Sequence, residues 1–157
     1  MQYRMRTHQF TGARVEELLK KEHVATIATL NSDGTPYVTP IHFVYENGKI
    51  YFHGLGAGQK IENIKNNPLV SFNTYNMDCY LYDDEGKPCD TNTKYQSVNI
   101  QGAATLVDDI AEKREILRLI IGKYTPDLSA DAMPDNAVKG AAVVEIEIKE
   151  ITGKYWE

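Results

Sequence analysis

Two short turn signals, each between β-branched and apolar segments, constrain the fold of this chain more than any other feature. Asp33-Gly34 separates VATIATLN (24–31) from TPYVTPIHFVYE (35–46), and Asn47-Gly48 separates that segment from KIYFHG (49–54). Asp-Gly and Asn-Gly pairs are typical of two-residue hairpin turns, whose central residues take positive φ. The sequence therefore predicts a meander of three antiparallel strands.

The rest of the chain predicts three more strands and three helices. The strands are expected at 69–75, 93–109 and 141–154, with Gly102 as a bend or bulge, and the helices at 13–22, 57–67 and 110–124. Residues 76–94 predict a long loop, and residues 125–139 a loop with one helical turn. Together the elements predict a mainly β fold with a few helices, a closed or half-closed barrel filled by side chains. A ligand would then bind outside the barrel or between two copies.

Length and charge limit the class of protein. The 157 residues fit one domain, 1–157, with an N-terminal arm over 1–12. The formal net charge of -5, without a long basic run, argues against nucleic acid or an anionic membrane as partner. No apolar run approaches the ~20 residues of a membrane span and no signal peptide is visible, so a cytoplasmic location is expected.

Neither metal binding nor nucleophilic catalysis has a recognisable pattern here. Cys79 and Cys89 form no CxxC motif, and no two histidines have close metal-ligand spacing. Structural or free thiols are expected, and a regulatory disulfide or a metal site is the alternative. Ser71, Ser97 and Cys79 lack an elbow motif, so no catalytic residue is assigned.

The stretch IYFHGLGAGQK (50–60) raises the question of an anion site. Its glycines match neither the dinucleotide fingerprint nor the P-loop, and alone they fit a turn equally well. Lys60, however, falls in the first turn of an expected helix, where the helix dipole disfavours a cation and favours an anion. We therefore expect Gly58, Lys60 and His53 to contact a phosphate group. For His53, packing or hydrogen bonding within the strand is the alternative.

Two other segments have candidate binding residues. Pro36 and Pro40 remove ladder donors from their strand, which leaves the backbone around 38–41 for a flat heteroaromatic ring, unless the segment is simply an irregular edge strand. On the fifth strand, Tyr95, Ser97 and Asn99 share one face. That polar face suits a ligand or a subunit boundary.

In order and spacing, these segments resemble the pyridoxamine 5′-phosphate oxidase-like FMN-binding split-barrel superfamily, and within it the nitroimidazole-resistance-type flavoproteins. The resemblance extends over roughly residues 14–154. It rests on VATIATLNSDGTPYVTPIHFVYENGKIYFHG, the GQK that opens the short helix, NNPLVSF, YQSVNIQGAATLVDD and ITGK.

The resemblance implies a six-stranded antiparallel split barrel that works as a homodimer, with FMN between the subunits. The FMN phosphate would lie near His53, Gly58 and Lys60. The isoalloxazine ring would be edged by the backbone of Val38, Thr39, Pro40 and Ile41, and the second subunit would approach with Tyr95, Gln96, Ser97 and Val98. Trp156 would lie near the flavin if the tail folds back.

Two departures from the family limit the function. Gly58-Gln59-Lys60 stands in place of a Ser-Arg-Lys-type phosphate segment, and ITGKYWE in place of an arginine-rich C-terminus, so oxidation of pyridoxamine phosphate is not expected. The resemblance implies an FMN-dependent oxidoreductase that passes electrons from a reduced nicotinamide to a small electrophile such as a nitroaromatic or a quinone. A non-catalytic flavin-binding or sensing protein, or a haem- or deazaflavin-binding member of the fold, is the alternative.

Overall fold

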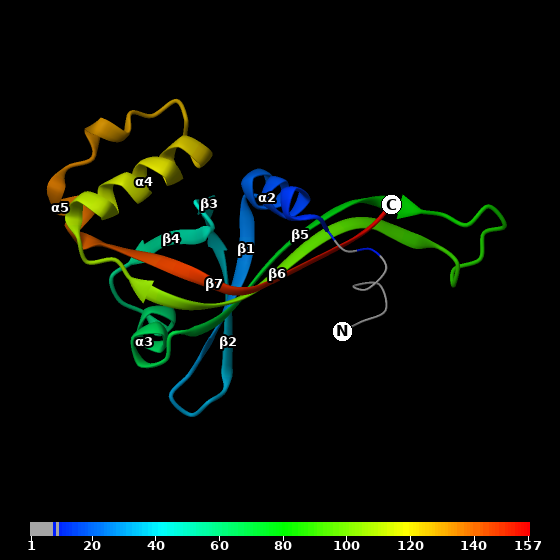
Figure 1. Cartoon of the computed structure of the whole chain (residues 1–157), viewed down its shortest axis with the longest axis horizontal. Helices are drawn as coiled ribbons and strands as arrows, with labels where there is room; N and C mark the ends of the chain where they lie inside the picture. Colours follow the sequence, from blue (N-terminus) through cyan, green and yellow to red (C-terminus); the bar gives the residue numbers. More distant parts are fainter. Residues whose placement is uncertain (1–7, 9) are drawn as a thin grey trace.

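The computed structural model describes residue 8 and residues 10–157 as one long antiparallel sheet with helices around it (Figure 1). The strands are β1 (Val24–Leu30), β2 (Pro36–His42), β3 (Val44–Glu46), β4 (Lys49–Leu55), β5 (Leu69–Leu81), β6 (Asn92–Leu106) and β7 (Ala141–Trp156). The helices are α2 (Gly12–Lys21), α3 (Gln59–Asn66), α4 (Ile110–Tyr124), the 3-10 turn η1 (Ala130–Ala132) and α5 (Asp135–Gly140). Most of the arm expected over 1–12 lies outside the described residues.

The sheet runs in the order β2-β1-β5-β6-β7-β4-β3, and each pair of neighbours with a recorded register is antiparallel. It curls so that β2 and β4 come into contact although they are not neighbours in the ladder. The predicted mainly β split barrel is therefore confirmed, and its open seam lies between β2 and β4.

Two apolar clusters hold this arrangement together. The larger fills the inside of the curled sheet and includes the fully buried rings of Phe43, Phe52 and Phe72. The smaller lies between α4 and the outer side of the sheet, where Ile116 and Ile120 pack with Val143. Helix α4 begins where the sequence predicts, because the side chain of Asp109 accepts a hydrogen bond from the Glu112 N–H at 2.8 Å.

The prediction of six strands is wrong by one, because the expected strand over 35–46 is broken at Phe43. The Phe43 N–H donates to the Tyr124 hydroxyl at 2.8 Å instead of to a neighbouring strand, and the Phe43 ring is fully buried. The break divides the segment into β2 and β3, which lie at opposite edges of the sheet. A tertiary contact from α4 thus overrides the continuous β-branched pattern.

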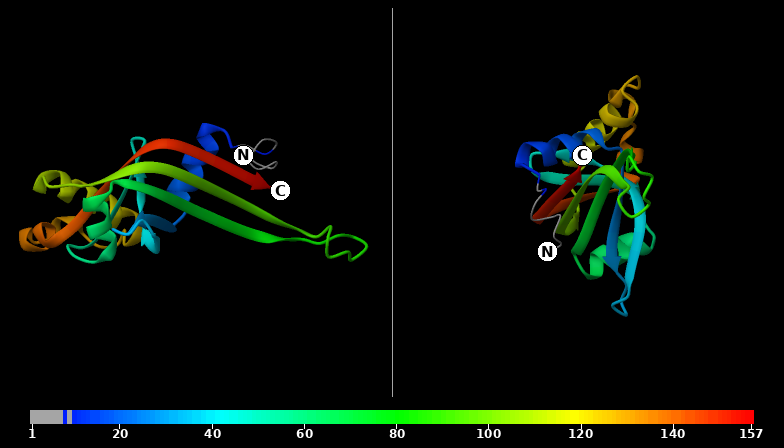
Figure 2. Two further views of the ribbon diagram at one scale, coloured as in Figure 1. Left: turned by 90° about the horizontal axis from the view of Figure 1, so that it is seen from below. Right: turned by 90° about the vertical axis from the view of Figure 1, so that its right-hand side faces the viewer.

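The prediction of a long loop over 76–94 is also wrong. Strand β5 continues to Leu81 and β6 begins at Asn92, so only the residues between them turn, and Figure 2 shows this hairpin as an arm that projects from the body. A register shift between Met77 and Cys79 interrupts the ladder. Because the arm extends past the core, it has no alternating buried face, and its sequence shows no period of two. Residues 125–139 contain η1 and α5 rather than one turn.

Gly102 lies at a register shift of β6 against β7, as its predicted role in a bulge requires. A Cβ atom there would come 2.5 Å from the Glu147 carbonyl oxygen and 2.7 Å from Cγ2 of Ile146. We expect Gly102→Ala to lower the free energy of unfolding by roughly 1–3 kcal/mol, because the core must shift to admit the methyl group. Urea denaturation measures the change.

Gly122→Ala is the matched control for this substitution. Gly122 is exposed within α4, and a Cβ atom there meets nothing within 4 Å. Because alanine is a better helix former than glycine, the free energy of unfolding of this variant should rise by about 0.8–1 kcal/mol. Equal urea midpoints for the two variants would contradict the role assigned to Gly102.

Candidate functional site

The open seam between β2 and β4 brings together three positively charged or titratable side chains. His42 ends β2, His53 lies on β4, and Lys60 comes from the first turn of α3. Partial desolvation, and then the charges of His42 and Lys60, lower the pKa of His53 below its ordinary value. The positive charge of Lys60 beside two imidazoles that can take up a proton gives the seam the electrostatics of an anion site.

Lys60 has the clearest need for an anion. Its side chain is half-buried with Nζ 5.1 Å from the centroid of the Phe52 ring, and desolvation lowers the pKa of its ammonium group. None of the ion pairs found among the described residues includes it. A partly desolvated cation of this kind gains most from a charged hydrogen-bonding partner.

The start of α3 adds backbone donors beside Lys60. The N-terminal cap is Gly58, with φ of 130°, and it offers no side chain to the first-turn N–H groups. Ile61 and Glu62 both donate to the Gly58 carbonyl oxygen, at 3.0 and 3.1 Å. The earlier N–H groups of the turn have no intrahelical acceptor, which is the usual arrangement of a helix terminus that binds an anion.

A side-chain network holds this helix start against the β1–β2 hairpin. Asn63, 2% exposed, donates to Thr29 Oγ1 at 3.0 Å and to Asn31 Oδ1 at 2.9 Å. Gln59 donates to the same Asn31 oxygen and to Asn63 Oδ1. Gln59 therefore positions α3 instead of reaching into the seam.

Strand β2 forms one edge of the sheet, which explains how it accommodates two prolines. Its residues alternate, with Ile41 packed into the larger core and Val38 58% exposed on the outer face. Thr39 Oγ1 is buried without a hydrogen-bond partner. Among the residues described, Thr39 Oγ1 and Ser97 Oγ are the only buried side-chain polar atoms without a hydrogen-bond partner. Both belong to segments that the sequence predicts to bind a ligand.

The second predicted segment, Tyr95 to Val98, lies on β6, away from the seam within one chain. Strands β1 and β5 separate β6 from β2, which at ~4.8 Å per strand is about 14 Å. Trp156 pairs with Tyr95 across β6 and β7, and its ring lies 4.7 Å from that of His8. The structure thus groups Val38–Ile41, His53, Gly58 and Lys60 around the seam, and Tyr95–Val98 with Trp156 elsewhere.

Tyr124 and His42 are seam residues that no sequence pattern indicated. The rings of His42 and Tyr124 stack with centroids 4.7 Å apart, and the Tyr124 hydroxyl accepts from Phe43 N–H and donates to the His23 carbonyl oxygen at 2.6 Å. Tyr124 therefore fixes the end of β2 against α4. The only available signal was the position of His42 after the two prolines, since a tyrosine ending a helix is unremarkable in sequence.

Removing the unpartnered hydroxyl of Thr39 tests whether it serves the protein or a ligand. A buried hydroxyl without a partner costs about 1–3 kcal/mol, so Thr39→Val should raise the free energy of unfolding of the ligand-free protein by ~1 kcal/mol. Urea denaturation gives the value. The same change in Thr29→Val, the matched control, removes the acceptor of Asn63 and should destabilise the protein. A loss of stability in both variants would show that Thr39 has a structural partner.

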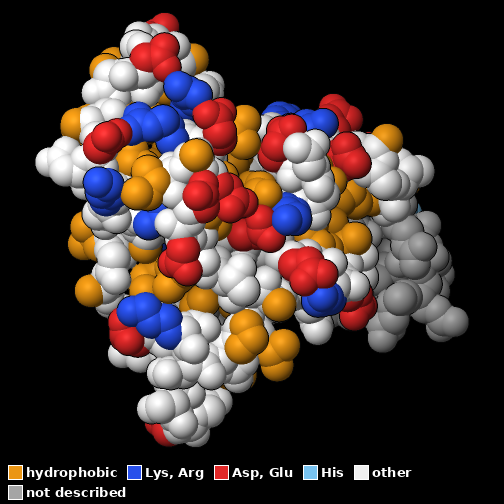
Figure 3. Space-filling model, turned by 60° about the vertical axis from the view of Figure 1, so that its left-hand side comes forward, with side chains coloured by type: hydrophobic (Ala, Val, Ile, Leu, Met, Phe, Trp, Pro, Cys, Tyr) orange, Lys and Arg blue, Asp and Glu red, His pale blue; other side chains and the backbone are white. Residues whose placement is uncertain are grey.

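Metal binding, disulfide formation and membrane insertion were each searched for in the described part of the chain. No group of three or more His, Cys, Asp or Glu side chains there is placed to hold a metal ion. Cys79 and Cys89 are both exposed and free. Searched in the same residues, no helix is long and apolar enough to cross a membrane. On the face seen in Figure 3, acidic and basic side chains are interspersed.

Comparison with known proteins identifies the family. Residues 11–155 match the family model of pyridoxamine 5′-phosphate oxidase. No curated protein sequence matches significantly. A candidate 5-nitroimidazole antibiotic resistance protein from Bacteroides thetaiotaomicron is 26% identical with a TM-score of 0.80, over 93% of this chain and 85% of that one.

Two further solved structures share the fold. The flavocytochrome Anf3 from Azotobacter vinelandii is 22% identical with a TM-score of 0.86, over 100% of this chain and 72% of that one. An FAD- and haem-binding protein from Mycobacterium smegmatis is 18% identical with a TM-score of 0.84, over 96% and 74%. Since the family model covers nearly the whole chain, this protein belongs to the pyridoxamine 5′-phosphate oxidase family.

Proposed function

We propose that this protein binds FMN at the seam between β2 and β4 and works as a homodimer, in which Tyr95 to Val98 of a second copy complete the site. The observation that carries the proposal is the pair of buried, unpartnered hydroxyls. Thr39 lies in one half of the expected site and Ser97 in the other, and one chain keeps these halves apart. Ser97, on the outer face of β6, gains a partner if a second copy brings the halves together around a polar ligand, and Thr39, on the same face of β2 as Ile41, gains one if that ligand enters the seam.

The residues of the seam fit FMN. Lys60 and the first turn of α3 offer a cation and N–H donors to the phosphate, with His53 and His42 beside them. Strand β2 offers an unpaired edge of backbone groups to the ring system. The names of the neighbouring structures, which include flavin-binding proteins, support a flavin over an unrelated phosphate ligand.

The outer face of β2, β1 and β5 supports the dimer. Val38, Val24 and Leu69 come from these three adjacent strands and are 58%, 53% and 61% exposed. Beside Leu69 lies a cavity of about 280 Å³ whose walls include Leu30, Pro36 and Val70. Val38 and Leu69 lie toward the same end of this face as Leu30 and Pro36, and Val24 lies toward the other end. Exposed apolar side chains along one sheet face are typical of a surface that a partner covers.

The reaction we propose is that of a flavin reductase, with a reduced nicotinamide as electron donor and a small electrophile such as a nitroaromatic or a quinone as acceptor. Bound FMN supplies the hydride and electron chemistry, and the protein supplies position and charge. Neither His42 nor His53 has a carboxylate partner among the ion pairs of the described residues, so we assign no proton donor in the protein. A nitroimidazole-resistance neighbour at 26% identity supports the class of acceptor.

The absorption spectrum of the purified protein, an FMN titration and light scattering test the proposal together. We expect flavin bands, tight binding of FMN to the apoprotein, bleaching by NADH or NADPH, and a mass twice the 17.7 kDa of one chain. A Soret band without flavin would overturn the cofactor. A yellow protein that neither nicotinamide bleaches would leave a flavin-binding protein that is not a reductase, and a monomer with FMN bound would exclude the shared site.

The histidine at the seam gives the cofactor affinity a pH dependence. In the free protein the lowered pKa keeps His53 largely neutral near pH 7, while a nearby phosphate favours its protonated form. Affinity for FMN should therefore rise as pH falls from 8 toward 6.5, with proton uptake on binding. In fluorescence titrations across this range, FMN affinity should depend less on pH in His53→Gln than in the unmodified protein. In His23→Gln the dependence should be unchanged. Equal slopes in all three proteins would remove His53 from the phosphate site.

A further inference from the structure

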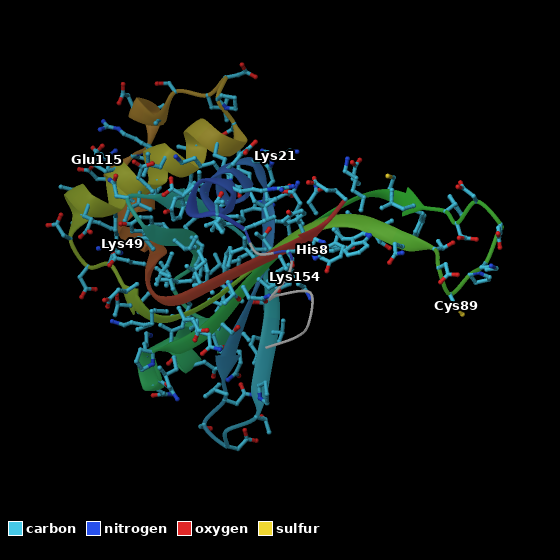
Figure 4. The ribbon with its side chains drawn as sticks, turned by 45° about the vertical axis from the view of Figure 1, so that its right-hand side comes forward. His8, Lys21, Lys49, Cys89, Glu115 and Lys154 are labelled. Atoms are coloured by element: carbon cyan, nitrogen blue, oxygen red, sulfur yellow. The ribbon has the colours of Figure 1, made fainter. Side chains whose placement is uncertain are left out.

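A concave site lies on the outer face of the sheet, along the base of the β5–β6 arm. It is an open groove of about 690 Å³ whose floor is formed by Asn73, Tyr75, Tyr95, Ser97, Asn99 and Lys154. Residues near the turn of the arm, including Cys89, line its far end. In Figure 4, Lys154 lies on β7 near the base of the arm and Cys89 at the tip. A volume of this size is ordinary for a small-molecule site.

The floor of the groove contains a buried hydroxyl group without a hydrogen-bond partner. Ser97 lines the groove and is 5% exposed, and its Oγ has no partner. A hydroxyl withdrawn from water in this way is costly unless a ligand completes it. Nearby, Asn73 Nδ2 donates to Asn99 Oδ1 at 2.9 Å, and Asn99 is exposed.

The groove also has an aromatic wall and a positive charge. The rings of Tyr75 and Tyr95 lie 6.1 Å apart at 38°, and Tyr75 is 51% exposed. Lys154 Nζ lies 5.9 Å from the centroid of the Tyr95 ring. Among the described residues that line the groove, Lys154 is the one cation and none is a carboxylate. The lining thus combines aromatic faces for a planar ring with hydrogen-bond donors and one site for an anion.

We propose that this groove binds a nucleotide, with its planar base against Tyr75 and Tyr95 and its phosphate near Lys154. The inference rests on the proposed function only in placing the groove beside the flavin of a second copy, through the shared residues Tyr95 and Ser97. Such a nucleotide is the adenylate half either of a dinucleotide flavin or of the reduced nicotinamide that donates electrons. One lysine suits a single phosphate group.

AMP is the probe that tests the groove, because it carries the shared chemistry without the flavin or the nicotinamide. We expect AMP to bind the purified protein in an isothermal or NMR titration, and Lys154→Gln to weaken it at least tenfold. Lys149→Gln, on the same strand in an exposed pair with Glu147, should leave AMP affinity unchanged. Ser97→Ala should weaken AMP while the thermal midpoint stays the same or rises, since the substitution removes an unpartnered hydroxyl.

Competition distinguishes the two sources of the adenylate group. If AMP displaces FAD but leaves the KM for NADH unchanged, the groove holds half of a dinucleotide flavin; if AMP raises the KM for NADH, the groove holds the donor. Absence of AMP binding at millimolar concentration, or equal loss in the Lys154 and Lys149 variants, would overturn the proposal. FMN affinity is measured separately, so a protein that binds AMP without FMN would refute the seam and not the groove.

Discussion

Replacing Lys60 with methionine is expected to weaken FMN binding roughly ten- to a hundredfold, which corresponds to ~1.5–3 kcal/mol for a charge-assisted hydrogen bond. The ammonium group is half-buried, unpaired with any described carboxylate, and placed at the start of α3. Methionine keeps the aliphatic cover over Phe52 and removes only the charge. Because the charge is partly desolvated in the free protein, its loss should leave the stability of the apoprotein unchanged or raised.

Lys65→Met is the control for this substitution. Lys65 lies in the last turn of the same helix and pairs on the surface with Glu62 at 2.9 Å, an exposed pair that contributes little. Fluorescence titration of each apoprotein with FMN gives the affinities. The same titration with riboflavin, which lacks the phosphate, gives the affinity of the ring system alone. If Lys60→Met weakens FMN and riboflavin equally, the lysine supports the fold of the seam and does not contact the phosphate.

The Asn47-Gly48 turn and the start of α4 were predictable because each depends on a few adjacent residues, whereas Asp33-Gly34 lies in a longer connection, residues 31–35, in which Gly34 but not Asp33 has positive φ. Asn47 and Gly48 both have positive φ, as their hairpin requires, and Asp109 caps α4 directly before its expected first residue. Their conformations are decided locally, so a short sequence pattern is sufficient. The start of α3 at Gln59, two residues after the expected start, shows the usual uncertainty of helix ends.

The two errors over 35–46 and 76–94 have different causes, a contact between distant residues in the first and a strand pair without a buried face in the second. The break at Phe43 depends on Tyr124, 81 residues away, which no local pattern reveals. The arm is strand because β5 and β6 pair with each other, although neither face of it is buried in the core. Sequence periodicity reports burial, and it is silent where a strand has two solvated faces.

The candidate site was predictable to a similar extent. Its charged component, Lys60 beside a glycine at a helix start, was visible in eleven residues because the helix dipole is a local property. The contribution of His42 was not, since the stacking with Tyr124 that orients it depends on how α4 packs. The segments of Thr39 and Ser97 were indicated by the two prolines of one strand and by the polar face of another, and the family resemblance added only the flavin. That the two hydroxyls are buried without partners became evident from the folded chain.

Placing a carboxylate on the outer sheet face should separate the two halves of the proposed site. Leu69→Glu puts a charge at a position that is 61% exposed in one chain, so the monomer should retain its stability. In the proposed dimer the same group is buried without a partner, which costs about 3–5 kcal/mol. We expect the dissociation constant of the dimer to rise at least a hundredfold, and FMN affinity to fall with it because Tyr95 to Val98 of the second copy are lost.

Leu128→Glu provides the comparison, because Leu128 is 65% exposed in the connection after α4, on another part of the surface. Light scattering over a range of protein concentrations gives the dimer constant, and FMN titration at the same concentrations gives the affinity. The two halves are linked if affinity in the Leu69 variant recovers as concentration drives the chains together.

A Leu69 variant that is monomeric at every concentration and binds FMN as tightly as the unmodified protein would show that one chain holds the cofactor. A variant that remains fully dimeric would place the interface on a different face of the sheet.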